Sequence, residues 1–527
     1  MNLALMEKEI ISAAQAARLI RQGDTLIIGG SGGIGVAEKV LEALESRFLS
    51  DREPGNLTIL HTTGIGAVTK YGLNRLAHVG LIKRVIGGNF GLQLPFMKEL
   101  IVSNRIEAYN FPQGVMCQLY RAMAGKQPGL ISHVGLGTYI DPRIDGGKMN
   151  DATTENLVEV LEVGGREMLF FHAPVANMAL IRGTTADDNG NISLEHEPAT
   201  LEGLSIAQAV HNAGGTVICQ VKRITGRGKL NPHMVRIPGF LIDKLVIDEN
   251  QAQNYAVNFD PSLCGETRRP IESIKPDPLN ERRIIARRAA RELYPGAVVN
   301  MGVGVSAGIP NVTAEEKLDG IFSITVESGV IGGFAGHGLY FGSAYNAEAI
   351  IDQAYMFDFY DGGGLDIAFV SFAEVDVEGN VNVTRFGNRN DGAGGFIDIT
   401  QNARRIIFSG TLTGGGLDVS LDSGHLVIEK EGKIKKFVPR VNQLSFNGPK
   451  AIANDVDVIF VTERAVFRLK GHGIEISEVA PGIDIEKEVL SQIPFPVSVP
   501  KTVKLMDHRI FLDGPMGIRD EIISKTH

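Results

Sequence analysis

Two stretches of the chain repeat each other at a fixed spacing, and this repeat limits the folds that the chain can adopt. "AARLIRQGDTLIIGGSGGIG", which starts at Ala16, aligns without gaps with "AARELYPGAVVNMGVGVSAG", which starts at Ala289. A second pair, "ADDNGNISL" at 186–194 and "VDVEGNVNV" at 375–383, follows in the same order. Helix–strand–glycine patterns also recur by chance in α/β proteins, but identical residues at identical spacing favour a duplicated domain.

Strand-like and helix-like segments alternate through both copies, which is typical of α/β domains with mainly parallel, buried strands. The strand candidates are "TLIIGG", "LTILHTTG", "GTVICQV", "AVVNMGVG", "IFSITVESG", "LDIAFVSFAEV" and "RRIIFSG". The segment between Cys264 and Ile284 contains three prolines and dense charge, which marks it as a linker. We therefore predict an α/β protein made of two related, open α/β domains, residues 1–265 and 284–527, joined by a linker at 266–283.

The composition is that of an ordinary globular protein. The chain of 527 residues is 43% hydrophobic and 21% charged, and its net charge of −9 argues against an extended nucleic-acid surface. The basic stretch "ERRIIARRAARE" is accordingly predicted to be a solvated or interface helix face. Cys117, Cys219 and Cys264 lack metal-site or disulfide spacing, which fits a reducing cytosol. The first 20 residues predict an amphipathic helix rather than a signal peptide, and no apolar run of about 18 residues predicts a membrane span.

The glycine-rich turn at 30–35 matches two well-known motifs and satisfies the requirements of neither. As G-x-G-x-x-G it would bind a dinucleotide, but the following strand candidate ends in His-Thr-Thr and lacks the acidic residue that holds the ribose. As G-x-S-x-G it would present Ser31 as a hydrolase nucleophile, but Ser31 aligns with Gly304 in the second copy. An NAD oxidoreductase and a serine hydrolase are therefore disfavoured, and a turn that permits close helix–strand packing is favoured.

One strand candidate ends in a carboxylate. "IFSITVESGVIGGFAGHG" places Glu327 at the carboxyl end of an apolar run, directly before a sharp turn. Ligands of open α/β sheets bind at that edge, and a glutamate there can attack an activated acyl group. A glutamate paired with an arginine at a strand end explains the same pattern, so the residues alone leave both interpretations open.

Two turns carry further candidates whose simpler interpretation is structural. Gln113 lies in the Pro-Gln-Gly turn of "YNFPQGV", where a glutamine is commonly solvated or caps the backbone. The glycine turn in "NDGAGGFIDI" at 390–399 is expected to lead into a strand.

Together these motifs resemble family I coenzyme A transferases, and most closely the acetate/propionate CoA-transferase branch with both halves in one chain. The motifs that carry the resemblance are "NFPQG", "GLGTYIDPRIDGGKMN", "VRIPGFLIDKLVID", "NMGVGVSAGI", "TVESGVIGG", "FYDGGGLDIAFVSFAEVDVEGNV", "DGAGGFIDI" and "FVTERAVFRL". The resemblance covers nearly the whole chain. It implies that Glu327 is the catalytic glutamate, with Ser328 at a position that varies between branches, and that Gln113 and Gly394 form an oxyanion hole.

The resemblance also implies the substrates and where they bind. The implied site lies between the domains, with coenzyme A near Asn300, Gly302, Gly304, Gly392 and Gly395 and the acyl group near Gly32, Gly33, Gly137 and Thr138. The implied reaction transfers coenzyme A from a short-chain acyl-CoA to a free carboxylate of the acetate, propionate or butyrate class through a glutamyl-CoA thioester. No prosthetic group, metal, membrane or nucleic acid is implied, and the enzyme is expected to be a cytoplasmic homodimer or tetramer. An acyl-CoA hydrolase on the same scaffold and a non-catalytic acyl-CoA-binding protein are the alternatives.

Overall fold

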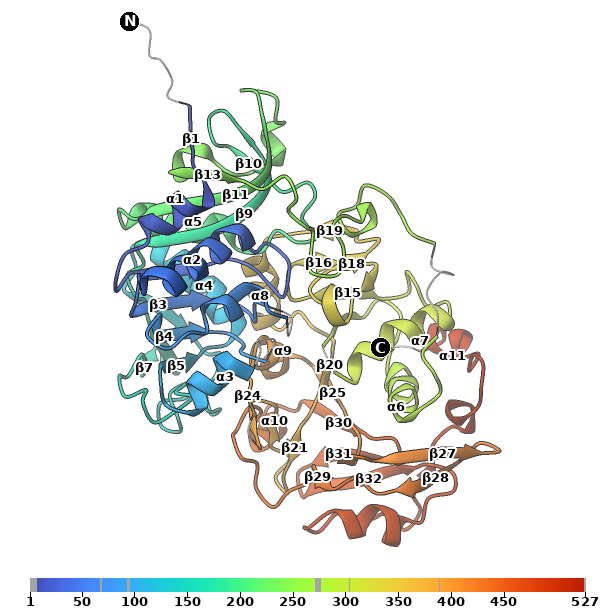
Figure 1. Cartoon of the computed structure of the whole chain (residues 1–527). Helices are drawn as coiled ribbons and strands as arrows, with labels where there is room; N and C mark the ends of the chain where they lie inside the picture. The colour runs from blue at the N-terminus through green and yellow to red at the C-terminus, as the bar shows by residue number, and fades with distance from the viewer. Residues whose placement is uncertain are drawn as a thin grey trace, which may run out of the picture.

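The two halves of the chain fold as two α/β units that lie side by side. The computed structural model describes residues 7–66, 69–91, 95–270, 276–302, 304–387 and 389–525. In Figure 1 the N-terminal half runs from blue to green and the C-terminal half from yellow-green to red. The α-helices are α1 (Ala13–Leu19), α2 (Glu38–Asp51), α3 (Pro95–Val102), α4 (Gln113–Ala124), α5 (Gly203–Asn212), α6 (Glu281–Ala290), α7 (Ile309–Glu315), α8 (Gln353–Asp361), α9 (Phe396–Asn402), α10 (Gly448–Ala453) and α11 (Arg519–Ile523).

A parallel sheet forms the core of the N-terminal half. Its spatial order is β1 (Glu9–Ile10), β13 (Lys244–Ile247), β11 (Thr216–Thr225), β9 (Met178–Asp187), β2 (Thr25–Ile28), β3 (Leu57–His61), β4 (Ile82–Gly87) and β5 (Glu107–Asn110). The short strands β10 (Ile192–Ser193) and β12 (Val235–Ile237) join it by antiparallel pairing. A separate antiparallel sheet contains β6 (Gly129–Ser132), β8 (Arg166–His172) and β7 (Val158–Val163). Every residue of β9 is buried, as expected for a central strand covered on both faces.

The sheet of the C-terminal half has a parallel centre flanked by antiparallel strands. Its order is β19 (Ala349–Ile350), β16 (Val330–Ile331), β15 (Ser323–Val326), β14 (Val298–Met301), β20 (Ile367–Ser371), β25 (Arg405–Ser409), β30 (Asp457–Val461), β31 (Ala465–Lys470), β32 (Gly473–Val479) and β33 (Lys504–Leu505). The short edge strand β33 pairs parallel with β32. Short hairpins and pairs extend from it: β17 (Phe334–Ala335) with β18 (Ala344–Tyr345), β21 (Glu374–Val375) with β22 (Val381–Asn382), β23 (Arg385–Phe386) with β24 (Arg389–Asn390), β26 (Thr413–Gly414) with β29 (Ile434–Lys435), and β27 (Asp418–Asp422) with β28 (His425–Lys430).

The two sheets repeat one strand order, which confirms the duplication. The parallel series β3-β2-β9-β11-β13 of the first half corresponds to β15-β14-β20-β25-β30 of the second. The second repeated motif also folds alike. The Asp187 carboxylate accepts the N–H of Asn191 at 2.9 Å, and the Asp376 carboxylate accepts the N–H of Asn380 at 3.0 Å. Each asparagine side chain then accepts a glycine N–H from a later segment at 2.9 Å, that of Gly239 in the first half and that of Gly448 in the second. The same turn therefore binds an equivalent later segment in both halves.

Three helices fill the space between the two sheets. In Figure 1, α8 and α9 of the C-terminal half lie against the N-terminal half, where both the picture and the contacts place α4 beside α8. The expectation of a strand after the glycine turn at 390–399 is wrong, because α9 begins at Phe396. Its first five residues are buried, so packing at the interface overrides the strand preference of the Phe-Ile-Asp-Ile run.

The N-terminal segment and the linker also differ from the sequence-based expectation. The helix expected over residues 1–20 begins only at Ala13, because Ser12 and Gln15 form a capping box, and Glu9–Ile10 pairs with β13 as a strand instead. Residues 1–6 of that expectation lie outside the described residues. Residues 271–275 of the predicted linker lie outside the described residues, and its last residues are helical, because α6 already begins at Glu281, where Asn280 caps it.

The basic helix α6 is not the solvated or interface face that its sequence predicts. Arg287 is fully buried and Arg288 nearly so. Arg288 forms hydrogen bonds of 2.6 and 2.7 Å to the Glu478 carboxylate, and Arg287 lies 3.2 Å from Glu315. Burial of a guanidinium requires such partners, which are distant in the sequence and therefore escape a local pattern.

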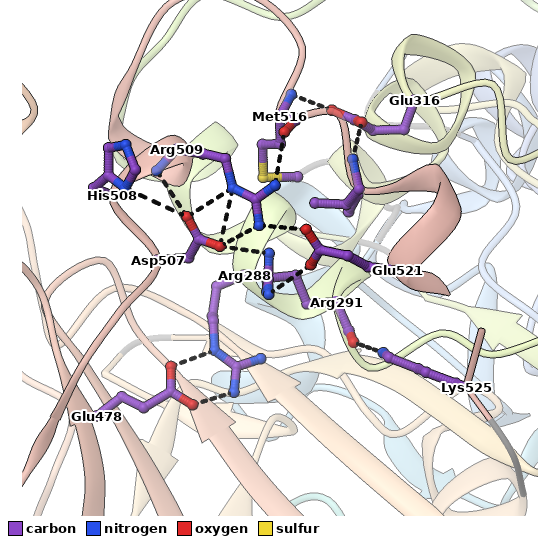
Figure 2. Close-up of polar contacts among 11 residues, drawn as sticks. Arg288, Arg291, Glu316, Glu478, Asp507, His508, Arg509, Met516, Glu521 and Lys525 are labelled. Carbon is purple, nitrogen blue, oxygen red and sulfur yellow. Dashed lines mark hydrogen bonds and ion pairs between the residues drawn. The ribbon is translucent and has the colours of Figure 1, made fainter. Parts of the chain in front are cut away.

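The same helix anchors the C-terminal segment. Figure 2 shows Arg291 and Arg509 converging on Asp507 and Glu521, with N–O separations of 2.9 Å for Arg291–Asp507 and 2.7 Å for Arg509–Glu521. The Glu316 carboxylate accepts backbone N–H groups of the segment around Met516, as Figure 2 also shows. These contacts fold the chain end back onto the C-terminal half. Among the described helices, none has the length and apolarity needed to cross a membrane.

Candidate active site

A cavity of about 270 Å³ lies between the carboxyl ends of the two sheets. Residues of both halves line it, including Thr63, Asn89 and Gln113 from the first and Glu327, Ser371 and Gly394 from the second. Each of these residues lies at or just after a strand end, or at or just before the start of a helix, so the facing sheet edges bring together residues that are far apart in the sequence. This placement agrees with the general location of ligand sites in open α/β sheets.

Glu327 follows β15 directly and its carboxylate is buried in the wall of this cavity. The residue is 7% exposed, and its Oε2 atom has no hydrogen-bond partner within the described part of the chain. Burial raises the pKa of Glu327 to about 7, while its own backbone amide and the Asn300 side chain oppose the shift. No arginine pairs with this carboxylate among the described residues, so the interpretation as an ion-paired glutamate is not supported.

Asn300 lies on β14, the strand next to β15, and supports the base of the site. It is fully buried, and its amide nitrogen lies 3.3 Å from the Thr325 carbonyl and 3.2 Å from the Tyr360 hydroxyl oxygen. The Tyr360 hydroxyl donates to the Thr325 hydroxyl at 2.9 Å. This network holds the end of β15 and keeps a side-chain amide beside the Glu327 carboxylate.

Gln113 and Gly394 come from opposite halves and meet across the cavity. Gln113 is the first residue of α4, and its N–H donates to the Gly394 carbonyl at 2.9 Å. Gly394 has a φ of +58°, and a Cβ built on it would lie 3.7 Å from Gln113 Oε1. A side chain at position 394 would therefore enter the space beside the Gln113 amide, and glycine leaves that space open.

The backbone amide of Gly394 is engaged in this structure. Its N–H donates to the Gly88 carbonyl at 2.6 Å, so it is available to another acceptor only if that bond opens. The next amide, that of Gly395 at the start of α9, has no acceptor among the described residues, and Gly395 also lines the cavity. Among the described residues, the N–H of Gly395 thus lacks an acceptor, whereas the N–H of Gly394 is bonded to the Gly88 carbonyl.

The residues expected to bind coenzyme A cluster around this cavity. Gly302, Gly392 and Gly395 line it, and Asn300 lies beneath Glu327. Gly304 lies beside the cavity-lining Ser371, with a φ of +93° and only 2.6 Å between a Cβ built on it and Ser371 Oγ. The sequence-predicted residues of this group are therefore brought together by the fold.

The residues expected to form the acyl pocket are placed differently. A Cβ built on Gly32 would lie 3.8 Å from the carbonyl oxygen of Phe341, a cavity-lining residue, and Gly33 packs against Tyr255. The glycine turn at 30–35 thus supports the cavity wall without lining it. Gly137 and Thr138 lie elsewhere on the interface: the Asn447 side chain donates to the Gly137 carbonyl at 2.9 Å, and Thr138 lines a separate cavity of about 20 Å³.

Several cavity residues were missed by the sequence interpretation. Thr63 and Asn89 follow β3 and β4 as Glu327 follows β15, so a polar residue after a strand was a usable signal for them. Phe341 had no such signal, because it lies in the turn between β17 and β18 and reaches the cavity only through the tertiary fold. Within the described residues, no group of three or more His, Cys, Asp or Glu side chains is arranged to hold a metal ion.

Comparisons with known proteins agree with this architecture. The coenzyme A transferase family model matches residues 10–248. The chain is 42% identical to the acetate CoA-transferase YdiF of Escherichia coli K12, over 96% of both chains. It is 40% identical to the caffeate CoA-transferase of Acetobacterium woodii, over 98% of this chain and all of the relative. The crystal structure of acyl-CoA transferase YdiF apoenzyme from Escherichia coli O157:H7 superposes with a TM-score of 0.93 at 41% identity, covering 98% of each chain.

The duplicated α/β halves and the carboxylate-bearing cavity between them define an acyl-transfer enzyme of the coenzyme A transferase type. The chain belongs to the family I coenzyme A transferases, as its motifs predict, and it is a CoA-transferase. A YdiF structure described as a thioester complex with CoA also superposes, with a TM-score of 0.92.

Proposed function

We propose that this CoA-transferase moves coenzyme A from a short-chain acyl-CoA to a free carboxylate through a glutamyl-CoA thioester on Glu327. The observation that supports this proposal most directly is the buried Glu327 carboxylate, which has no ion-pair partner among the described residues and lies in a cavity shared by both halves. A desolvated carboxylate with a raised pKa is a better nucleophile than a hydrated one and carries no ion partner that must first be displaced.

The proposed reaction has two covalent half-reactions. The Glu327 carboxylate attacks the thioester carbonyl of the donor and expels coenzyme A as a thiolate, which leaves a mixed anhydride. The thiolate then attacks the glutamyl carbonyl of that anhydride, which forms the glutamyl-CoA thioester and releases the first acid. The acceptor carboxylate runs the same steps in reverse, so the thioester bond is conserved and the kinetics are ping-pong.

Each attack creates an oxyanion, and Gln113 and the glycine loop are placed to bind it. The Gln113 side-chain amide and the N–H of Gly394 serve as donors in this proposal, and the latter requires release from Gly88. Loss of one such donor typically lowers the rate by about 10²–10³. The Gly395 amide lies in the same loop, and its N–H has no acceptor within the described residues.

The cavity has a volume of about 270 Å³, and the hydrophobic residues Phe341, Val370, Val383 and Ile399 form part of its wall. In this proposal the apolar wall accommodates the acyl group of a small acid, and the bound substrates displace water from the thioester. Exclusion of water suppresses hydrolysis of the glutamyl-CoA thioester. A cytoplasmic homo-oligomer remains our expectation for the assembly.

Trapping the covalent intermediate tests the proposal. The protein is incubated with acyl-CoA, reduced with borohydride and digested for mass spectrometry, and we expect modification only of the peptide that contains Glu327. Glu327→Gln is expected to abolish both the adduct and transfer while remaining folded. Full turnover without an adduct, or an adduct elsewhere, would refute the mechanism. Thiol release without added acid would identify a hydrolase, and comparison of acetate, propionate and butyrate with caffeate measures acceptor preference.

A further inference from the structure

Asn110, the last residue of β5, has a fully buried side chain that joins segments of both halves. Its amide nitrogen donates to the carbonyls of Gly87 and Gly88, both at 2.7 Å, at the end of β4. Its Oδ1 atom accepts the N–H of Ala393 at 2.8 Å and the hydroxyl of Tyr139. The Asn110 side chain thus uses its two N–H donors and its amide oxygen together. It connects the ends of β4 and β5 in the first half to the loop around Ala393 in the second.

The loop that Asn110 holds, residues 391–394, forms several backbone hydrogen bonds to the N-terminal half, while the N–H groups of Asp391 and Gly392 donate to Thr384 within the C-terminal half. The Phe90 N–H donates to the Asp391 carbonyl at 2.6 Å, and the Gly394 N–H donates to the Gly88 carbonyl at 2.6 Å. The Gly88 carbonyl is the same group that Asn110 fixes. Asn110 therefore sets the orientation of the acceptor that receives the Gly394 amide.

The loop sequence is fitted to Asn110 as well. A Cβ built on Gly392 would lie 2.4 Å from the Asn110 amide nitrogen, and Gly392 has a φ of +74°. No side chain fits there without displacing Asn110. The close approach explains why a glycine occupies this position independently of any role in binding coenzyme A.

We propose that Asn110 is a positioning residue for catalysis, which holds Gly394 in register with Gln113 across the domain interface. This inference rests on the proposed function of Gln113 and Gly394 as oxyanion donors. Asn110 does not line the cavity, so it acts through the loop and not on the substrate. Its chemistry is specific, because aspartate retains the acceptor but lacks the two donors, and alanine leaves buried carbonyls unpaired.

The expected kinetic effect follows from the step at which an oxyanion hole acts. Oxyanion donors bind charge that develops only in the transition state, so their misplacement lowers kcat more than it changes KM. A displacement of about 1 Å in such a site can lower the rate by about 10²-fold. We expect Asn110→Asp to lower kcat by about 10- to 100-fold while KM for acyl-CoA changes by less than about threefold.

The matched control is Asn150. Its amide nitrogen also donates to two backbone carbonyls, those of Ile101 at 2.7 Å and Ile106 at 2.9 Å, and its Oδ1 accepts the Thr153 hydroxyl. Asn150 is not among the residues that line the cavity, and its side-chain hydrogen bonds go to Ile101, Ile106 and Thr153 rather than to residues 391–394, so Asn150→Asp makes the same chemical change without removing a contact to the loop. We expect its kcat to stay within about twofold of the unmodified enzyme, since substitutions outside the site do not act on the transition state.

Hydrogen exchange of the unliganded protein tests the positioning separately from the chemistry. We expect peptides covering 390–396 to exchange faster in Asn110→Asp than in the unmodified protein or in Asn150→Asp. If Asn110→Asp does not fold, Gly392→Ala is the second variant, because its Cβ would displace the Asn110 amide from the loop side. We expect it to reproduce both the faster exchange at 390–396 and the lower kcat. Unchanged exchange at 390–396, or a change in KM without one in kcat, overturns the inference. A missing Glu327 adduct in the unmodified enzyme instead refutes the proposed function, and the exchange result still decides the positioning.

Discussion

The raised pKa of Glu327 predicts a specific dependence of the first half-reaction on pH. In the proposed mechanism Glu327 must lose its proton to attack the thioester, and burial raises its pKa to about 7. Because burial disfavours the charged form, the active carboxylate forms only as pH rises through this value. About a tenth of the enzyme is then ionised at pH 6 and about nine-tenths at pH 8, so kcat/KM for acyl-CoA should rise about tenfold between them.

The assay is the initial rate of acyl-CoA consumption from pH 5.5 to 8.5 at constant ionic strength, with kcat/KM reporting the free enzyme. Asn300→Ala removes the side chain that lowers the pKa of Glu327, so we expect its inflection to move to higher pH. Glu202 is the control, because it is a second buried glutamate whose pKa burial raises, to about 8. It does not line the cavity, and its Oε1 accepts the Thr62 hydroxyl at 2.8 Å. Glu202→Gln should therefore leave the inflection near pH 7.

Two outcomes would refute this reasoning. A flat profile across the range, or an inflection near the ordinary glutamate value of about 4.3, would show that Glu327 is ionised before substrate binds. Loss of the inflection in Glu202→Gln would show that another carboxyl controls the rate.

Two further substitutions test the loop and the fold. Gly394→Ala places a Cβ 3.7 Å from Gln113 Oε1 at a φ of +58°, so we expect kcat to fall by about tenfold or more with coenzyme A affinity retained; equal kcat would contradict the geometry. Arg464 is fully buried against Glu463 at 2.6 Å and near Glu431 at 2.8 Å, so Arg464→Ala should lower the free energy of unfolding by about 3–5 kcal/mol in urea titration. A loss comparable to that of the exposed Arg404→Ala, about 0.5 kcal/mol, would contradict it.

The sequence predicts the architecture well because the duplication leaves a direct record in it. The segment 25–28 and its counterpart 298–301 are both central strands, and the repeated Gly-Asn turns fold with the same Asp–Asn hydrogen bonds. Strand periodicity and fixed spacing are local properties, so a single sequence contains them. The position of Glu327 in the cavity wall follows the same logic, since it directly follows an apolar strand and precedes a sharp turn.

The contacts that complete the site are not local, and the sequence does not contain them in readable form. The run at 396–399 resembles a strand and forms a helix that packs against α8, with Gly114 of α4 close to its Asp398 side chain. Gly137 and Thr138 belong to a loop that reaches the interface, but it meets α10 rather than the cavity. Asn110 stands in a motif that the sequence singles out, yet its role depends on Ala393, which lies 283 residues away.

The duplication explains why the site must be shared between the halves. Thr25 and Val298 are equivalent positions of the repeat. Thr25 pairs with Thr58 in the first sheet and Val298 pairs with Ser323 in the second, so Thr58 is equivalent to Ser323. Further along the same strands, Thr62 is therefore equivalent to Glu327. Thr62 donates to the buried Glu202, so this strand end serves the internal structure instead of presenting a nucleophile. The two equivalent sheet edges have therefore diverged: one supplies the carboxylate, and the other supplies Gln113 and the carbonyls that hold the glycine loop. Because each half lacks what the other provides, the chemistry that we propose at Glu327 depends on the interface to which Asn110 contributes.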